Sequence, residues 1–157
     1  MLDNNGSERL THLVIAAPPF NPKDVKMVPF EGVRPQPGKL LRKSVQVMAL
    51  DGVRVSELLT RREREMTSIS VALGELKPSQ RSPLHKHAAS DEAYFILEGD
   101  GVVTSGELHE QIGKDTLISV PKTNKHGLEN NGKSRLRVLA FESPPYKEED
   151  FYPIETA

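Results

Sequence analysis

The sequence predicts an all-β fold, a sandwich or barrel built from short strands. Two patterns favour it: short stretches in which apolar and polar residues alternate, and frequent turn residues between those stretches. A third observation is that no long helical periodicity, internal repeat or low-complexity tract is present. The 157 residues are enough for a substantial core, so we expect one domain.

The N-terminal part is expected to be irregular. Residues 1–9 are polar, and residues 10–17 contain β-forming side chains that could make one extra strand. Residues 18–39 contain six prolines, too many for a helix or a central strand. We therefore divide the chain into an extended arm, a barrel and a C-terminal tail, at residues 1–40, 41–145 and 146–157.

The remaining strands follow from alternation and turn signals. Residues 53–65 are ambiguous between a helical turn and a charged edge strand, and a strand is favoured. A hairpin turn is expected at Asp51–Gly52. The other expected strands cover residues 43–50, 66–76, 92–97, 102–104, 108–112, 116–120 and 135–142.

The strand at residues 66–76 has one bulky face and one small face. Ile69, Val71 and Leu73 alternate with smaller residues. The small face can leave room for a ligand, or it can fit under a neighbouring sheet, and the sequence does not choose between the two. The small residues are Ser68, Ser70, Ala72 and Gly74.

The stretch from Ser79 to Gly99 carries the chemistry. His85 and His87 are two residues apart, so in an extended chain both imidazoles point to one side. After a turn at residues 88–91, Glu92 begins a strand on which Tyr94 and Ile96 share its face. Two imidazoles and a carboxylate from adjacent strands are a suitable ligand set for a divalent transition metal.

This stretch resembles the first motif of the cupin superfamily, G-x5-H-x-H-x(3,4)-E-x6-G, and its spacing fits throughout. A second stretch, from Asp115 through Pro121 and His126 to Asn130, is similar to the family's second motif, G-x5-P-x-G-x2-H-x3-N. The sequence departs from the pattern at three positions where the family usually has glycine, the residue favoured where φ must be positive. These are Ser79, Asp115 and Thr123.

The resemblance implies a cupin-type double-stranded β-helix, that is, a jelly-roll barrel. It also implies one divalent transition metal, with Fe2+ favoured and Mn2+, Ni2+, Co2+ or Zn2+ as alternatives. Three of the five histidines fall on ligand positions; His12 and His109 do not, and we expect them at the surface or in packing roles. The ligands carried over from the family are His85, His87, Glu92 and His126.

Tyr94 and Glu92 are the candidate catalytic residues. The Tyr94 phenol is expected to face the cavity, where it could donate a hydrogen bond, relay a proton or only fill space. Asn130 is expected to satisfy backbone groups at a turn. Arg81 could meet an anionic substrate at the rim or be solvated. The sequence leaves the direction of Arg135 and Arg137 open.

These observations favour a metal-dependent enzyme acting on a small oxygenated organic acid or carbonyl compound. Dioxygenase chemistry is favoured narrowly over isomerase, lyase or decarboxylase chemistry, because an ion with open positions can serve all of them. The alternative is a non-catalytic cupin that binds a small molecule or metal as a sensor or accessory protein.

Composition limits the partners. A net charge of −1 without a basic run gives no reason to expect nucleic-acid binding. The absence of cysteine excludes disulfides and thiolate ligands. The apolar stretch Leu13–Ala17 is too short for a signal-peptide core or a membrane span, so we expect a cytoplasmic protein. We also expect a homodimer, because Ala93, Phe95 and Leu97 should form an outward apolar face that needs a cover.

Overall fold

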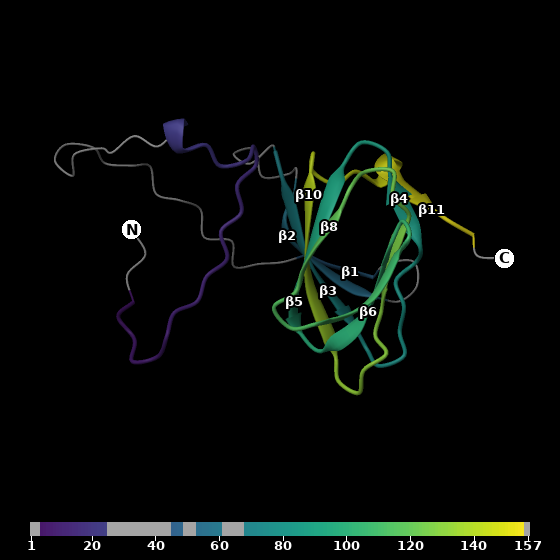
Figure 1. Ribbon diagram of the computed structural model, residues 1–157, viewed down its shortest axis with the longest axis horizontal. Helices are drawn as coiled ribbons and strands as arrows, with labels where there is room; N and C mark the ends of the chain where they lie inside the picture. The colour runs from purple at the N-terminus through teal and green to yellow at the C-terminus, as the bar shows by residue number, and fades with distance from the viewer. Residues whose placement is uncertain (1–3, 25–44, 49–52, 61–67, 156–157) are drawn as a thin grey trace. The chain divides into compact units, whose positions relative to one another are not determined.

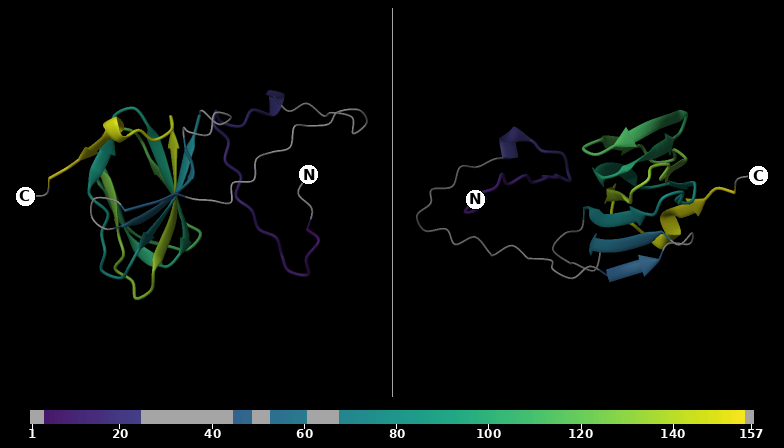
Figure 2. Two further views of the ribbon diagram at one scale, coloured as in Figure 1. Left: turned by 180° about the vertical axis from the view of Figure 1, so that it is seen from behind. Right: turned by 90° about the horizontal axis from the view of Figure 1, so that it is seen from below.

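The computed structural model describes residues 4–24, 45–48, 53–60 and 68–155. The chain divides into two compact units, Met1–Pro35 and Gln36–Ala157. In the first unit, the described residues contain one short 3-10 helix, η1 (Pro22–Asp24), and no strand. The second unit carries all the described strands, arranged as two antiparallel sheets that face each other (Figures 1 and 2).

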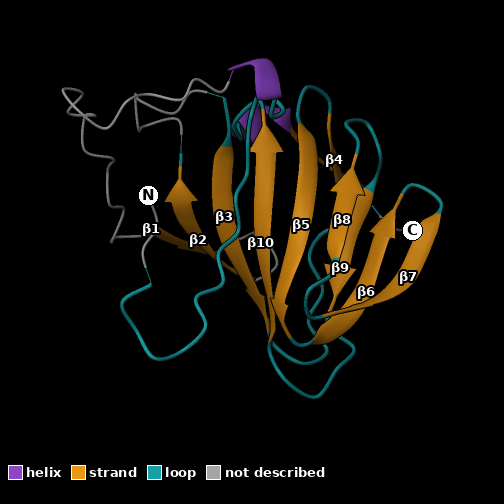
Figure 3. Cartoon of the chain, turned by 60° about the vertical axis from the view of Figure 1, so that its left-hand side comes forward, coloured by secondary structure: helices purple, strands orange, loops and turns teal. Residues whose placement is uncertain are grey.

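One sheet has six strands in the order β1-β2-β3-β10-β5-β8 (Figure 3). The last long strand in the sequence, β10, lies between β3 and β5 and pairs with both in antiparallel register. The strands are β1 (Val45–Met48), β2 (Arg54–Leu59), β3 (Ser70–Leu76), β5 (Asp91–Glu98), β8 (Leu117–Val120) and β10 (Leu136–Ser143).

The other sheet has five strands in the order β11-β4-β9-β6-β7. It brings β4, near the middle of the chain, between β9 and the C-terminal β11. The strands are β4 (His85–His87), β6 (Asp100–Ser105), β7 (Leu108–Gly113), β9 (His126–Glu129) and β11 (Phe151–Pro153). A second 3-10 helix, η2 (Glu148–Asp150), directly precedes β11.

The core lies between the two sheets and is almost entirely aliphatic. Alternate residues of β5, β6 and β10 point into it, as the period of two requires. Its most deeply buried aliphatic side chains are Leu76, Ile96, Val103, Val120, Leu136 and Val138. This confirms the all-β jelly-roll prediction, because two stacked antiparallel sheets enclose a single core.

Most expected strands form, with shifts of a few residues at their ends. The ambiguous stretch 53–65 contains β2, which confirms the strand interpretation. The strand expected at residues 66–76 begins at Ser70, and Ser68 lies in a bend. The hairpin turn expected at Asp51–Gly52 lies outside the described residues.

The extra strand considered for residues 10–17 does not form. All of these residues are described, and none is in a strand. Leu10, Leu13 and Val14 are exposed, and no partner strand pairs with them. β-forming composition is only a preference for a half-buried pleated surface, and here no such surface is provided.

The region predicted as a C-terminal tail contributes structure that the sequence did not reveal. Residues 151–153 form β11 and pair with β4 in the register Phe151↔His87 and Pro153↔His85. The backbone N–H of Ile154 donates a hydrogen bond to the Leu84 carbonyl, 2.8 Å away, which extends this contact. The strand that carries two predicted metal ligands is therefore covered on one edge by the end of the chain (Figure 1).

The three positions that depart from the family glycines keep a glycine-like backbone. Ser79, Asp115 and Thr123 have φ values of 64°, 67° and 71°, in the left-handed region. Their N–H groups donate backbone hydrogen bonds to Asn130, Ile96 and His87 at 2.8, 2.9 and 2.7 Å. The turn geometry is therefore preserved, at a conformational cost of about 1–2 kcal/mol for each non-glycine residue.

Gly99, by contrast, has no tolerated replacement. Its φ is 83°, and a Cβ there would lie 2.4 Å from the Arg135 carbonyl oxygen. A clash with backbone cannot be relieved by rotating a side chain. At Gly99 a side chain has no space, whereas Ser79, Asp115 and Thr123 have room for their side chains. Those three residues bear only the energetic cost of a positive φ.

Candidate metal centre

Strand β4 presents two imidazoles to the space between the sheets. His85 and His87 are buried while Lys86 between them is exposed, as expected for alternate residues of a strand. Their ring centroids are 5.1 Å apart. His126, the first residue of β9, lies opposite His85 in the register and its ring centroid is 4.1 Å from that of His85.

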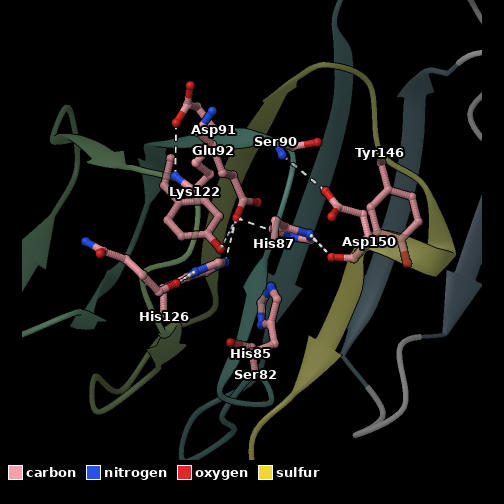
Figure 4. Close-up of polar contacts among 12 residues, drawn as sticks. Ser82, His85, His87, Ser90, Asp91, Glu92, Lys122, His126, Tyr146 and Asp150 are labelled. Atoms are coloured by element: carbon pink, nitrogen blue, oxygen red, sulfur yellow. Dashed lines mark hydrogen bonds and ion pairs between the residues drawn. The ribbon is translucent and has the colours of Figure 1, made fainter.

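Glu92 completes the cluster from the other sheet. It is buried on β5, on the inward face that it shares with Tyr94 and Ile96. Its Oε2 lies 2.8 Å from Nε2 of His126 and 3.8 Å from Nε2 of His87. One ligand atom from each of His85, His87, Glu92 and His126 lies within 4.8 Å of the others, and the four side chains converge in Figure 4.

Each histidine is held by a backbone carbonyl through Nδ1. His85 Nδ1 lies 2.9 Å from the Pro83 carbonyl, His87 Nδ1 3.0 Å from that of Asp150, and His126 Nδ1 2.8 Å from that of Asn124. A carbonyl can only accept, so Nδ1 carries a proton, and in the neutral ring this leaves the Nε2 lone pair free to bind a metal. Burial, followed by the neighbouring His126, lowers the pKa of His85 to about 4, which favours the neutral ring.

The close pair His126–Glu92 indicates that a cation fits here. Nε2 of His126 is buried and makes no hydrogen bond, although a carboxylate oxygen lies 2.8 Å away. Two lone-pair-bearing atoms at this distance repel unless a positive charge lies near both. Ligands about 2.0–2.2 Å from one ion are about 3 Å apart when they are adjacent at right angles. Three imidazoles and a carboxylate can therefore hold one divalent transition metal, as predicted.

Tyr94 acts on the carboxylate ligand. Its hydroxyl donates a 2.9 Å hydrogen bond to Oε2 of Glu92, and the whole side chain is buried. Burial raises the pKa of Tyr94 well above its usual value, with the charge of Glu92 adding to the effect. The phenol thus stays protonated and orients the Glu92 carboxylate, while its predicted catalytic role remains a prediction.

Asp150, which the sequence analysis did not single out, supports the ligands from the C-terminal side. Its carboxylate accepts hydrogen bonds from the backbone N–H groups of Ala88, Ala89 and Ser90, at 2.9–3.2 Å. Burial alone would raise its pKa, but these bonds hold the pKa of Asp150 below its usual value. The same residue's carbonyl accepts from His87 (Figure 4). One buried residue thus fixes a ligand and the loop that joins it to Glu92.

Three of the four cluster residues line a cavity of about 470 Å3 between the sheets, and His126 lies outside the lining set. His85, His87, Glu92 and Tyr94 line its polar end. The small face of β3 lines another part through Ser70, Ala72 and Gly74, so these residues leave room for a ligand rather than fitting under a sheet. Ser68, which lies before the strand, is not among the lining residues. The volume is within the range usual for small-molecule sites.

Glu142 is a second carboxylate on the cavity wall. It lies on β10, directly across from Glu92 on β5, and its Oε2 is buried without a hydrogen-bond partner among the described residues. Burial raises its pKa to about 9, and the charges of Glu92 and Asp150 add to the shift. A sequence signal existed, since Glu142 shares strand parity with the cavity residues Val138 and Ala140.

The other residues weighed from the sequence lie away from the ligands. Asn130 is fully buried and bonds the backbone at Leu76, Ser134 and Gly132, which confirms its structural role. Arg81 is largely exposed and pairs with Glu129 at 2.9 Å, as expected for a solvated arginine. His12 is exposed, and His109 contacts Thr104 at the surface. Arg135 and Arg137 both form ion pairs with Glu75.

The chain belongs to the cupin superfamily. Residues 72–142 match the Cupin domain family. Over 105 residues the chain is 34% identical to an uncharacterized protein of Methanocaldococcus jannaschii, covering 67% of this chain and 84% of that protein. Residues 72–142, which match the Cupin domain family, contain all four cluster residues. The resemblance carried by the two motifs is therefore confirmed.

Solved structures share the fold. A predicted oxalate decarboxylase from Thermotoga maritima superposes with a TM-score of 0.60 at 24% identity, covering 68% of this chain and 99% of that one. A conserved protein with a double-stranded β-helix domain from Klebsiella pneumoniae gives a TM-score of 0.56 at 16% identity, covering 79% of this chain and 91% of that one. At these identities the likeness establishes the jelly-roll fold alone.

The described part of the chain contains no helix that is long and apolar enough to cross a membrane.

Proposed function

We propose that this protein is a metal-dependent enzyme that acts on a small oxygenated organic acid or carbonyl compound. The observation that carries the proposal is the buried His85, His87, Glu92 and His126 cluster opening onto a cavity of about 470 Å3. A purely structural metal site is closed, whereas a catalytic one keeps positions open to a pocket. We further propose that it functions in the cytoplasm, which cell fractionation would test.

The residues of the site have different roles: some would bind the metal, some orient the ligands, and some line the cavity. A divalent ion in this site would supply Lewis acidity and, in the case of Fe2+, redox chemistry. The carbonyls of Pro83, Asp150 and Asn124 hold the three imidazoles in place, and Tyr94 holds Glu92 through its hydroxyl. The aliphatic walls exclude water from a substrate bound beside the ligands.

Dioxygenation is the reaction we place first. Fe2+ accepts the imidazole and carboxylate ligand set, and a water-poor cavity protects reactive intermediates. Reconstitution of the purified protein with each of Fe2+, Mn2+, Ni2+, Co2+ and Zn2+, followed by oxygen-uptake measurements with small α-hydroxy and α-keto acids, is the test. Oxygen uptake only with Fe2+ supports dioxygenation. Equal turnover under strict anaerobiosis contradicts it.

Isomerase, lyase or decarboxylase chemistry is the second candidate, and Glu142 is the observation that favours it. This carboxyl lines the cavity with an unpaired oxygen, and its raised pKa of about 9 keeps a proton available at neutral pH. The similarity in fold to a predicted oxalate decarboxylase is compatible with this candidate. Binding of small acids without turnover of any of them would instead support a non-catalytic sensor or accessory protein.

The ligand assignment is tested without any substrate. His126→Ala should reduce metal content strongly, because it removes one of four ligand atoms. His109→Ala is the matched control, because His109 is a surface histidine that hydrogen-bonds Thr104 and does not belong to the cluster. Elemental analysis of both variants gives the result. Full metal content in His126→Ala would contradict the assignment.

We also propose that the protein is a homodimer. Phe95 and Leu97 on the outer face of β5 are only half-buried among the described residues, so an apolar surface is left to cover. Analytical ultracentrifugation at high micromolar concentration is the measurement. A monomer under these conditions would contradict the proposal.

A further inference from the structure

Away from the metal ligands, the walls of the cavity are mostly aliphatic. Val55 on β2, Ala72 on β3, and Val138 and Ala140 on β10 line this part of the space. This wall has no role in holding a metal. An apolar wall next to a polar end is the arrangement that binds a ligand with one polar head and an apolar body.

The charges around the cavity are unbalanced. Besides Glu92, three carboxylates line it, from Glu57, Glu142 and Glu148. Apart from the histidines of the cluster, Lys147 is the only basic residue among the described lining residues, and it is exposed, as is Glu148. Arg137, on the strand that supplies Val138 and Ala140, is paired with Glu75 and Glu98 and is not among the lining residues.

A second anionic group on a substrate would therefore meet no partner in the interior. Moving a carboxylate from water into an apolar wall is costly unless a cation or several donors receive it. Glu142 has a buried oxygen without a hydrogen-bond partner among the described residues, and even when protonated this carboxyl would offer a single donor and no positive charge. Because Lys147 is exposed, the metal end is the only buried part of the described lining that would offer a positive charge, once an ion is bound.

We propose that the substrate has a single oxygen-rich head that binds the metal and an uncharged, largely apolar tail that occupies the wall of β2, β3 and β10. Small dicarboxylates and phosphorylated compounds are excluded by the same wall. This inference rests on the proposed function, because the head is held by the metal. It narrows the broad class of small oxygenated compounds to amphipathic ones.

Three hydroxamates with one head and different tails test the inference on the full-length, Co2+-loaded protein. Acetohydroxamate reports the head alone, hexanohydroxamate adds four methylenes, and adipic acid monohydroxamate replaces the terminal methyl of that tail by a carboxylate. Dissociation constants come from the visible spectrum of Co2+ and from calorimetry. We expect hexanohydroxamate to bind about 10-fold or more tightly than acetohydroxamate.

The adipic acid derivative should lose that gain, and bind about 10-fold more weakly than hexanohydroxamate. Equal or tighter binding of the carboxylated tail would overturn the inference, and so would a tail that adds no affinity. If none of the three hydroxamates binds, the proposed function itself fails, because no open metal position is present. The two failures are thus distinguishable.

Reversing a charge on the cavity wall gives an independent test of the inference. Glu57→Arg places a cation at the cavity on β2, away from the ligands, and should restore binding of the carboxylated tail several-fold without changing acetohydroxamate binding. Glu110→Arg, on the exposed part of β7, is the matched control and should change neither. If Glu57→Arg does not fold, Glu57→Gln should still narrow the difference between the two long tails. If neither Glu57 variant reduces the difference in affinity between hexanohydroxamate and adipic acid monohydroxamate, the proposed role of this wall in rejecting charged tails is overturned.

Discussion

The two peripheral segments of the chain look alike in sequence and differ in structure. Residues 4–24 and residues 144–155 each contain three prolines and no long alternating pattern. In the first, the side-chain hydrogen bonds are local, such as that from Gly6 N–H to Asn4 and from Lys23 N–H to Asn21. In the second, the contacts reach residues about sixty positions earlier in the chain, through Asp150.

The C-terminal segment differs because it contains a buried acid that meets backbone donors. Asp150 receives three N–H groups from the loop after His87, and Phe151 stacks on His85 at 4.4 Å with an interplanar angle of 25°. Tyr146, Lys147 and Glu148 line the cavity. Composition therefore does not distinguish a segment with only local hydrogen bonds from one that supports the site; the long-range polar partners do.

Deleting one segment or the other should give the largest difference in metal affinity. Removing residues 144–157 takes away β11 and the Nδ1 partner of His87, so metal affinity should fall by about 100-fold or more. Removing residues 1–35 should change metal affinity less than about 2-fold, because the cluster residues and the groups that hydrogen-bond them lie outside that unit. Chelator competition measures both, with circular dichroism as the check on folding.

Equal losses of metal affinity in the two deletions would contradict the comparison. The N-terminal deletion also tests a second proposal, that the arm helps to cover the apolar outer face of β5 in the dimer. A shift from dimer to monomer in sedimentation would support the arm as part of the subunit contact, and an unchanged dimer would remove it from that role.

A single substitution, Asp150→Ala, should have the next largest effect. It leaves three backbone N–H groups without their carboxylate, so we expect metal affinity to fall about 10-fold. Glu149→Ala is the matched control, because the Glu149 side chain is next to Asp150 in the sequence, carries the same charge and is exposed. Asp150→Asn keeps an acceptor and should fall between the two. Identical affinity in the Asp150 and Glu149 variants would show that the segment only covers the site.

Glu142, just before the C-terminal segment, should make stability depend on pH in the metal-free protein. Its pKa is raised from 4.5 to about 9, so its contribution to the free energy of unfolding is fully present below pH 4.5 and is lost as the pH rises towards 9. Glu142→Gln should flatten this slope and be more stable than the parent at pH 8, by on the order of 1 kcal/mol or more. Urea unfolding at pH 5 and pH 8 is the measurement. An unchanged slope would contradict the shift.

The smallest effect should come from Ser79→Gly. Glycine relieves the strain of a φ of 64° but increases the entropy of the unfolded chain, so the two terms nearly cancel. We expect a change in unfolding free energy within about 0.5 kcal/mol, measured by urea denaturation. Gly99→Ala is the contrasting variant and should destabilise strongly, because its Cβ would meet backbone at 2.4 Å. A large stabilisation by Ser79→Gly would mean that strain dominates.

The sequence predicted what local periodicity determines. The shared face of His85 and His87 follows from a period of two, whereas the assignment of Glu92 and His126 as ligands follows from the resemblance of two stretches to the cupin motifs. The same rule placed Ala93, Phe95 and Leu97 on the outer face of β5, where they are half-buried. Such features depend on residues close in the sequence, so they survive without knowledge of the tertiary structure.

The supporting residues could not be predicted in the same way. Asp150 matters because it meets a loop sixty residues away, and nothing near it in the sequence reports that contact. Residues 10–17 show the opposite situation. Their local pattern favours a strand, but no described strand pairs with them and the strand does not form. Glu142 lies between these extremes, since its strand parity was visible but the burial of its carboxyl was not.

The central position of β10 has a consequence for the order of events during synthesis. All four ligands precede β10 in the sequence, yet this strand lies between β3 and β5, and Glu142 on it faces Glu92 across the ladder. A growing chain therefore exposes its three imidazoles before the sheet that carries Glu92 can close. Sheets that depend on such distant pairings form slowly. We expect metal acquisition to follow translation of β10 and β11, so the ion is a late addition to a finished barrel rather than the template around which it folds.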